Sequence, residues 1–485
     1  MANQLFATKP LEVLLKQAED SEHGLKRALG PIDLTLLGVG AIIGAGIFVL
    51  TGNAAAQHAG PAIVLSMILA GIACAFAGLC YSEMATMIPI AGSAYTYSYA
   101  TMGEFIAWVI GWDLILEYAL GAATVSVGWS GLVVSFLKHF NITIPTEWAS
   151  APIAYDTASG TWSASGAILN VPAFIVVMLV TAILVVGIRE SANVNSIIVF
   201  LKVGVLVTLT VVGIAYINAD NWKPFIPENT SGKFGVFGLS GILAGAGRIF
   251  FAYIGFDAVS VAAQESKKPQ RDLPIGILTS LVICTILFIA FAGVLTGVVH
   301  YTKLGGPAPV AILVEEMKQP VFSTVVELGA IAGLTSVMLV MLLAQPRIFY
   351  IMSNDGLLPE WFSRIHPKFR TPAGPTILTG VVVGLVGALF PINILNDMVS
   401  IGTLFAFVLV CAGVWVMRHT KPDAHRPFRT PFVPAVPILG MICCLALMLG
   451  LGLQTWMRLF IWLAIGLLIY FLYGKNNSKL RNSTA

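Results

Sequence analysis

The sequence predicts an all-α integral membrane protein with twelve transmembrane helices, two of which are broken near mid-bilayer. Of its 485 residues, 57% are hydrophobic and only 11% are charged, whereas soluble domains typically carry roughly 45–50% apolar and about 25% charged residues. The chain has 27 Lys and Arg and 24 Asp and Glu residues, which are too few charged side chains for the water-exposed surface of a soluble protein of this size. The net charge of +3 is spread over short loops, which argues against a nucleic-acid partner.

A helix needs roughly 20 apolar residues to cross a bilayer core about 30 Å thick. By this measure, twelve segments are predicted to span the membrane. They lie near 33–56, 62–88, 104–136, 170–188, 192–217, 239–264, 274–299, 321–352, 375–391, 395–417, 433–453 and 456–473. The chain then divides into a polar segment 1–32, five spans over 33–217, five over 239–417, two over 433–473, and a tail 474–485.

The distribution of basic residues predicts the orientation of the chain, because loops rich in Lys and Arg stay in the cytoplasm. With both termini inside, six basic residues fall outside and two fall within spans, so 19 of the 27 lie on the cytoplasmic side. The outer six are Lys138, Lys223, Lys233, Lys303, Lys318 and Arg458, and the two within spans are Lys202 and Arg248. We therefore expect a multi-pass protein of the plasma (inner) membrane with cytoplasmic termini.

The sequence contains no pattern typical of an enzyme or of a metal site. The seven histidines fall in loops or at span ends, and the six cysteines lie inside apolar runs, where they are expected to pack as small hydrophobic side chains. Neither a Gly-x-Ser-x-Gly turn nor a phosphate-binding loop occurs. We expect no catalytic residues, no metal and no cofactor.

Two spans are expected to be interrupted. Gly44-Ala45-Gly46 lies in the middle of the first span, and Gly255 lies in the middle of the sixth between aromatic residues, Arg248 and Asp257. Close packing against a neighbouring helix is the alternative explanation for the glycines. Five spans separate the two segments, so they cross in opposite directions, as an inverted repeat of spans 1–5 on 6–10 requires. Interrupted helices at matching positions of two halves indicate a transporter binding site.

The breaks themselves suggest the ligand. A broken helix exposes free N–H groups at one new end and free carbonyls at the other. The N–H groups can bind a carboxylate, and the carbonyls can bind an ammonium group or a cation. An α-amino acid carries both groups, so it is the expected substrate.

Several motifs resemble the amino acid–polyamine–organocation superfamily, in particular its cationic amino acid transporter branch with its bacterial homologues. These motifs are Gly44-Ala-Gly-Ile-Phe48, Pro89-Ile-Ala-Gly-Ser-Ala-Tyr95, Gly111-Trp-Asp-Leu-Ile-Leu-Glu-Tyr118, Phe250-Phe-Ala-Tyr-Ile-Gly-Phe-Asp257, Asn354-Asp-Gly-Leu-Leu-Pro359 and Pro427-Phe-Arg-Thr-Pro-Phe-Val-Pro434. The resemblance covers residues 25 to 473 in order. It implies the twelve-helix fold with a 5+5 inverted repeat and the transport of amino acids.

The resemblance also implies which backbone groups bind the substrate. Amides around Gly44, Ala45 and Gly46 are expected to hold its carboxylate. The expected contacts of its amine are carbonyls, which belong to Phe251, Ala252, Ile254 and Ile43.

Lys202 lies about ten residues into the fifth span, roughly 15 Å from its start at 1.5 Å per residue. In related bacterial transporters, a lysine at this place occupies the position that sodium takes in sodium-coupled relatives. The resemblance therefore favours proton coupling, with Lys202 gaining and losing a proton beside the first break. A structural lysine that caps the carbonyls of a broken helix is the alternative.

Other ionisable side chains inside the membrane are candidates because charges there are costly and usually face a cavity. Glu117 is a candidate for substrate contact or proton relay, and an ordinary hydrogen bond to span 8 or 10 is the alternative. Asp257, near the second break, is a candidate for substrate binding, through a cationic side chain, or for pairing with a lysine. Arg248 is either an external gate or an interface anchor. Met341, on the eighth span, is expected to line the pocket opposite the two breaks, although most methionines at helical spacing only pack.

These features predict a secondary amino acid transporter that takes up L-amino acids with protons by alternating access. An amino acid exchanger and a non-transporting amino acid sensor are the alternatives. The expected partners are the amino acid, protons and the lipid bilayer, and a small membrane-protein partner stays open. An apolar pocket would favour neutral substrates, whereas Glu117 or Asp257 facing it would favour cationic ones.

Overall fold

The computed structural model describes residues 5–12, 14, 29–90, 92–156, 160–186, 192–306, 308–318 and 320–482. Within these residues, eight helical stretches are long and apolar enough to cross a membrane, and three apolar helices are shorter. The eight are Pro31–Met87, Glu104–Lys138, Ile197–Ile214, Gly238–Val261, Pro269–Val298, Thr324–Asn354, Ile392–Thr420 and Leu453–Arg481, and the shorter ones are Val171–Val186, Ala373–Leu389 and Ala435–Gly450. The predicted class of helical membrane protein is confirmed.

The helices follow the predicted apolar segments closely. In chain order, the main elements are α3 (Pro31–Ile42), η2 (Gly46–Leu50), α4 (Thr51–Ala54), η3 (Ala55–Ala59), α5 (Ile63–Met87), α6 (Ser93–Thr101), α7 (Glu104–Ile115), η5 (Leu116–Leu120), α8 (Gly121–Lys138), α9 (Val171–Val186), α10 (Ala192–Ile214), α11 (Gly238–Ile249), η8 (Phe250–Tyr253), α12 (Ala258–Val261) and η9 (Ala262–Glu265). They continue with α13 (Pro269–Val298), α14 (Pro309–Glu316), α15 (Pro320–Asn354), α16 (Ala373–Leu389), α17 (Ile392–Thr420), α18 (Ala435–Gly450), α19 (Leu453–Ile469), η12 (Tyr470–Gly474), α20 (Lys475–Asn477) and α21 (Lys479–Asn482).

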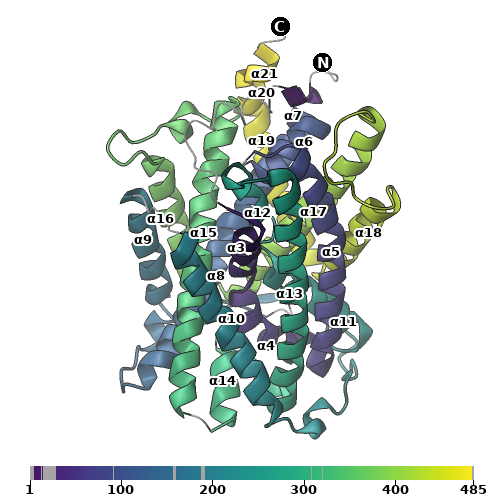
Figure 1. Ribbon diagram of the computed structural model, residues 1–485. Coiled ribbons are helices and arrows are strands. Elements are labelled where there is room, and N and C mark those ends of the chain that lie inside the picture. The colour runs from purple at the N-terminus through teal and green to yellow at the C-terminus, as the bar shows by residue number, and fades with distance from the viewer. Residues whose placement is uncertain are drawn as a thin grey trace.

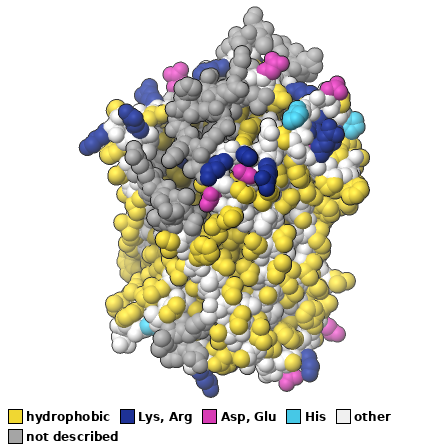
Figure 2. Space-filling model, in the orientation of Figure 1, with side chains coloured by type: hydrophobic (Ala, Val, Ile, Leu, Met, Phe, Trp, Pro, Cys, Tyr) yellow, Lys and Arg dark blue, Asp and Glu magenta, His cyan; other side chains and the backbone are white. Residues whose placement is uncertain are grey.

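The long helices form one bundle whose two ends differ (Figure 1). Helices α20 and α21 lie at one end together with α6 and the start of α7, and α14 lies at the other. We call the first the terminal end, because Lys9 near the N-terminus and Lys479 near the C-terminus both contact Asp355 there. Hydrophobic side chains dominate the middle of the face in Figure 2, and charged side chains gather toward its two ends.

Elements between the spans were not predicted, because they are too short to leave a periodic apolar signal. A two-stranded antiparallel sheet pairs β1 (Ile153–Asp156) with β2 (Thr161–Ala164), with Ile153 opposite Ala164. The guanidinium of Arg458 lies over the ring of Tyr155 of this hairpin, 4.7 Å from its centroid. Helices α6 and α14 were also missed, and α6 proves important for the site.

Four of the basic residues assigned to the inner side, Lys16, Lys26, Arg27 and Arg189, lie outside the described residues. All six cysteines are free, and five of them are buried, in agreement with their expected packing role.

Candidate functional site

The first break lies one position earlier than the glycine pair suggested. Helix α3 ends at Ile42, and the next residue, Ile43, has an extended backbone (φ −73°, ψ 103°) while its N–H still bonds the Val39 carbonyl. Helical geometry returns at Ala45 (φ −58°, ψ −30°), and η2 begins at Gly46. The chain thus leaves the helix over Ile43 and Gly44, which frees the last carbonyls of α3 and the first amides of η2.

The second break lies between η8 and α12. Ile254 is extended (φ −61°, ψ 138°) and follows the tight turn Phe250–Tyr253. Gly255 has φ +118°, a conformation that L-residues with a Cβ rarely adopt. The Gly255 carbonyl then accepts the Ala258 N–H at 3.1 Å, which starts the short helix α12. Both predicted interruptions are therefore present in the structure.

The two breaks pack directly against each other. A Cβ on Gly255 would lie 2.8 Å from the carbonyl carbon and oxygen of Ala41, and a Cβ on Gly46 would overlap the backbone of Ala252. Glycine is required at both places because the backbones approach too closely for a side chain. Thus η2, which follows the first break, and η8, which precedes the second, are in contact.

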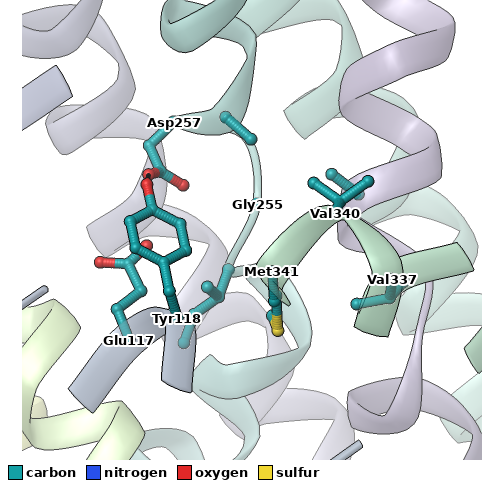
Figure 3. A pocket seen from close by; sticks show the side chains of 10 residues that line it. Glu117, Tyr118, Gly255, Asp257, Val337, Val340 and Met341 are labelled. Atoms are coloured by element: carbon teal, nitrogen blue, oxygen red, sulfur yellow. Dashed lines mark hydrogen bonds between the residues drawn. The ribbon is translucent and has the colours of Figure 1, made fainter. Parts of the chain in front are cut away.

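A small buried pocket adjoins this contact (Figure 3). Its lining includes Ala41, which precedes the first break, and Asp257 and Ala258, which follow the second, so it lies on the α3 and α12 side of the contact. It takes residues from α3, the η5 turn, the second break, α12 and α15. Its lining consists of Ala41, Glu117, Tyr118, Ile254, Gly255, Asp257, Ala258, Val337, Val340 and Met341. One wall is apolar, from Val337, Val340 and Met341, and the facing wall carries two carboxyl groups.

The two carboxyl groups come from different helices. Glu117 and Asp257 are 1% and 0% exposed, and both face the pocket in Figure 3. The Tyr118 hydroxyl donates a hydrogen bond to Asp257 Oδ2 at 3.1 Å. Among the described residues, Asp257 Oδ1 and both Glu117 oxygens accept no hydrogen bond of good geometry, and their nearest polar neighbours are each other's carboxyl groups and, for Glu117, the Thr403 hydroxyl. Because unpartnered buried carboxyl oxygens are costly, this wall is suited to a ligand that donates hydrogen bonds.

Lys202 reaches the end of α3 from α10. Its side chain is fully buried, and its Nζ donates to the carbonyls of Gly40 at 2.7 Å and Ile43 at 3.3 Å. Its stem passes Gly333 of α15, where a Cβ would lie 3.1 Å from Lys202 Cγ. The amine therefore occupies the carbonyl end of the broken helix, where a positive charge is favoured by the helix dipole.

Arg248 forms an ion pair that links α11 to α17. Its Nε lies 3.2 Å from Asp397 Oδ1, and the two side chains are 14% and 3% exposed. Asn396 Nδ2 also donates to the Arg248 carbonyl at 3.1 Å. This pair joins the last turn of α11, before the second break, to the first turns of α17.

The Arg248 ion pair supports a stability prediction. We expect Arg248→Gln to lower the free energy of unfolding by about 1–3 kcal/mol, less than for a fully buried pair because Arg248 keeps some contact with solvent. The loss arises because Asp397 remains buried without its counter-charge. Chemical denaturation of the purified protein measures it.

Two controls accompany this prediction. Asp220→Asn removes an exposed ion pair with Lys223, whose side chains are 78% and 76% exposed, and should change stability little. Arg248→Gln combined with Asp397→Asn should recover part of the loss. Equal stability of Arg248→Gln and the unmodified protein would contradict the prediction.

The structure brings together part of the predicted site. Glu117, Ile254, Asp257 and Met341 line one pocket. Ile43 supplies a carbonyl to Lys202 rather than to the pocket. The remaining predicted substrate contacts are buried but do not line the pocket: Gly44, Ala45, Gly46, Phe251 and Ala252. Gly46 and Ala252 form the contact between the breaks, and a Cβ on Gly44 would lie 3.1 Å from Cγ2 of the pocket residue Val337.

Sequence reasoning missed several residues of the site. Tyr118 directly follows Glu117, and its hydroxyl, the natural partner for a buried carboxyl, could have been noticed. Val337 lies one helical turn before Met341, a spacing that places both on the same helix face. Asp397 gave no local signal, because its role depends on where α17 lies relative to α11.

The bundle of apolar helices and the buried pocket between two broken helices define a multi-pass membrane protein with a small-molecule site of the kind found in transporters. The sequence profile of the amino acid permease family matches residues 29–472. The chain therefore belongs to the amino acid permease family, as the resemblance predicted.

Relatives similar over their whole length agree with this assignment. The chain is 45% identical over 481 residues to the branched-chain amino acid permease BcaP of Bacillus subtilis (strain 168), covering 99% of this chain and 100% of that protein. It is 44% identical over 478 residues to the methylthioribose transporter of the same organism, covering 99% of each. It is 31% identical over 595 residues to the vacuolar cationic amino acid transporter 4 of Arabidopsis thaliana, covering 99% and 97%. These relatives are named as permeases and transporters, so the prediction of a non-enzyme is confirmed.

Proposed function

We propose that this protein is a secondary active transporter that takes up an L-amino acid together with protons by alternating access. The observation that carries the proposal is the buried pocket at the meeting point of two broken helices. Such a site supplies amides, carbonyls and a closed space at mid-membrane. The helices over all twelve predicted segments support twelve spans with a 5+5 inverted repeat, in which α3 and α11 begin the two halves.

The proposal includes an orientation. The terminal end faces the cytoplasm of a plasma (inner) membrane, since most of the basic residues are expected in loops on that side. The pocket then lies on the cytoplasmic side of the contact between the breaks. The Arg248–Asp397 pair would close the external side, in keeping with a gate role for Arg248.

In this proposal, the substrate backbone binds at the breaks and its side chain extends into the pocket. Amides at Gly44, Ala45 and Gly46 would receive the carboxylate once the outer halves separate, and carbonyls of Phe251, Ala252 and Ile254 would receive the amine. The apolar wall at Met341 suits a neutral, branched side chain, consistent with the name of the permease relative at 45% identity.

A cationic substrate is the second candidate. It is favoured by one observation, the facing wall of Glu117 and Asp257 with its unpartnered oxygens. A positively charged side chain would supply the missing donors and counter-charge. Five relatives named as cationic amino acid transporters are 29–38% identical to this chain, against 45% for the branched-chain amino acid permease of Bacillus subtilis.

Thermal unfolding of purified protein with each of the twenty L-amino acids, and with methylthioribose, tests the substrate. A true ligand at 100 times its Kd stabilises the folded state by about 2.7 kcal/mol and raises Tm. We expect leucine, isoleucine or valine to give the largest increase. A larger increase with arginine or lysine would favour the second candidate, and no increase with any amino acid would contradict the proposal.

Transport in proteoliposomes separates the mechanisms. A proton symporter accumulates labelled substrate against its gradient when the outside is made acidic, without amino acid inside. An exchanger would take up label only into preloaded vesicles, and a sensor would accumulate none. We expect accumulation driven by the proton gradient alone.

A further inference from the structure

Both chain termini meet at one acidic residue at the terminal end of α15. Asp355 follows directly after α15, and Lys9 Nζ forms an ion pair with its Oδ1 at 2.8 Å. Tyr95 of α6 donates its hydroxyl to Asp355 Oδ2 at 2.9 Å. From the other terminus, the Lys479 N–H donates to the Asp355 carbonyl at 3.1 Å. The side chains of Lys9 and Asp355 are only 12% and 14% exposed.

Residues 6–9 are held in place by backbone contacts. The Lys9 N–H donates to the Tyr99 carbonyl and the Glu104 N–H donates to the Ala7 carbonyl, both at 3.1 Å. A Cβ on Gly103 would lie 2.5 Å from the Phe6 carbonyl carbon and oxygen. Residues 6–9 therefore lie directly on the connection between α6 and α7.

The C-terminal segment is held by a second acidic residue in the same region. Glu104, at the start of α7, is 0% exposed. Its carboxylate accepts hydrogen bonds from Tyr470 at 2.9 Å, from Tyr99 at 3.2 Å and from Ser478. Arg481 Nε lies 3.1 Å from the same carboxylate. We refer to Lys9, Tyr95 and Asp355 as the terminal clamp, and to Glu104 and its four partners as the Glu104 cluster.

Helix α6 connects the terminal clamp to the pocket. Its first residue, Ser93, has its Oγ 3.4 Å from the Oγ of Ser260 on α12. The Ser260 hydroxyl donates to the carbonyl of the pocket residue Asp257 at 2.6 Å. Two residues later on α6, Tyr95 binds Asp355. Helix α6 therefore lies between α12 and the end of α15, on the terminal side of the pocket.

We propose that the terminal clamp is the cytoplasmic gate of this protein, in which Lys9 and Tyr95 hold Asp355 and thereby keep α6 closed beneath the pocket. The proposal rests on the proposed function as a transporter by alternating access and on the orientation inferred with it. Release of the substrate to the cytoplasm requires Asp355 to separate from Lys9 and Tyr95. The Glu104 cluster anchors the C-terminal segment beside the gate but does not bridge α6 to α15.

Labelling of a buried cysteine behind the clamp tests this proposal without any substrate. Ser260 is 0% exposed, so Ser260→Cys should react slowly with a water-soluble maleimide in purified protein in nanodiscs. We expect Lys9→Ala to speed this labelling by about fivefold to tenfold, a size in keeping with the loss of a partly buried ion pair. Tyr95→Phe, which removes only the hydroxyl, should speed it by a smaller factor.

Matched variants make the outcome decisive. Lys223→Ala removes an exposed ion pair in a different loop and should leave the labelling rate of Ser260→Cys unchanged. Exchange of the charges, Lys9→Asp with Asp355→Lys, should restore slow labelling. The protein without Ser260→Cys gives the background from the six native cysteines.

Equal labelling rates for Lys9→Ala, Tyr95→Phe and the parent would overturn the gate proposal. Lys9→Ala could also speed labelling by destabilising the whole protein, which a lower Tm would reveal. In that case, the Tyr95→Phe and charge-exchange variants distinguish gate opening from unfolding, because exchanging the charges would not restore slow labelling in a generally unfolded protein. Because labelling needs neither substrate nor a gradient, its failure would leave the proposed transport untouched. Failure of the amino acid binding and uptake experiments would, conversely, leave the labelling result standing.

Discussion

Replacement of Gly46 by alanine is expected to reduce uptake by at least about tenfold. Overpacking a core costs about 1–3 kcal/mol, and each 1.4 kcal/mol changes a rate or an equilibrium constant about tenfold. A Cβ at this position would overlap the backbone of Ala252. Backbone cannot move aside as a flexible side chain can. The closed contact between η2 and η8 would then be disfavoured, and the transport cycle would lack one of its states.

The chain offers a matched control for this variant. Gly204 of α10 has no atom within 4 Å of a Cβ built on it, so Gly204→Ala should leave uptake and Tm unchanged. Uptake of labelled substrate into proteoliposomes, normalised to the folded protein, measures both variants. Full activity of Gly46→Ala would show that the two broken helices need not close on each other at this point.

Replacement of Lys202 by alanine is expected to abolish the dependence of uptake on an imposed proton gradient. Its amine is the group that reaches the carbonyls of Gly40 and Ile43 at the end of α3. Without it, no proton can be gained or lost beside the first break. In the unmodified protein, uptake should increase as the external pH falls, whereas Lys202→Ala should show little change across the same range.

The alternative role of Lys202 as a structural cap gives a different result. If its charge only satisfies the α3 carbonyls, Lys202→Arg should keep both stability and the pH dependence. If it carries the proton, Lys202→Arg should fold but lose the pH dependence, since a guanidinium does not deprotonate in proteins. Undiminished pH dependence in Lys202→Ala would reject proton coupling through this residue.

The apolar segments were predictable because each span is a local property of the chain. About 20 consecutive apolar residues need lipid whatever surrounds them, and the helices begin and end within a few residues of the predicted limits. Broken helices could be located as well, since glycines in the middle of a span lower the cost of leaving the helix. The start of the first break at Ile43 rather than Gly44 was beyond this reasoning, because the register depends on packing against α12 and α15.

For the ionisable residues too, some features could be predicted from the sequence and others could not. Lys202, Glu117 and Asp257 could be singled out because charges inside a membrane need a partner or a cavity. Their partners could not be predicted. The Arg248–Asp397 and Lys9–Asp355 pairs join residues that are 149 and 346 positions apart, and no local pattern connects such distant parts of a chain.

Residence in a membrane, the two interrupted helices and the family could all be predicted from the amino-acid sequence. Those properties follow from composition, from local glycine content and from short motifs. The position of the pocket beside the breaks, the contact of Lys202 with the end of α3, and the meeting of Lys9 and Lys479 at Asp355 became known from the packed structure. These depend on how helices distant in sequence pack together, because the ligand site and its closing contacts are built between helices rather than within any one of them.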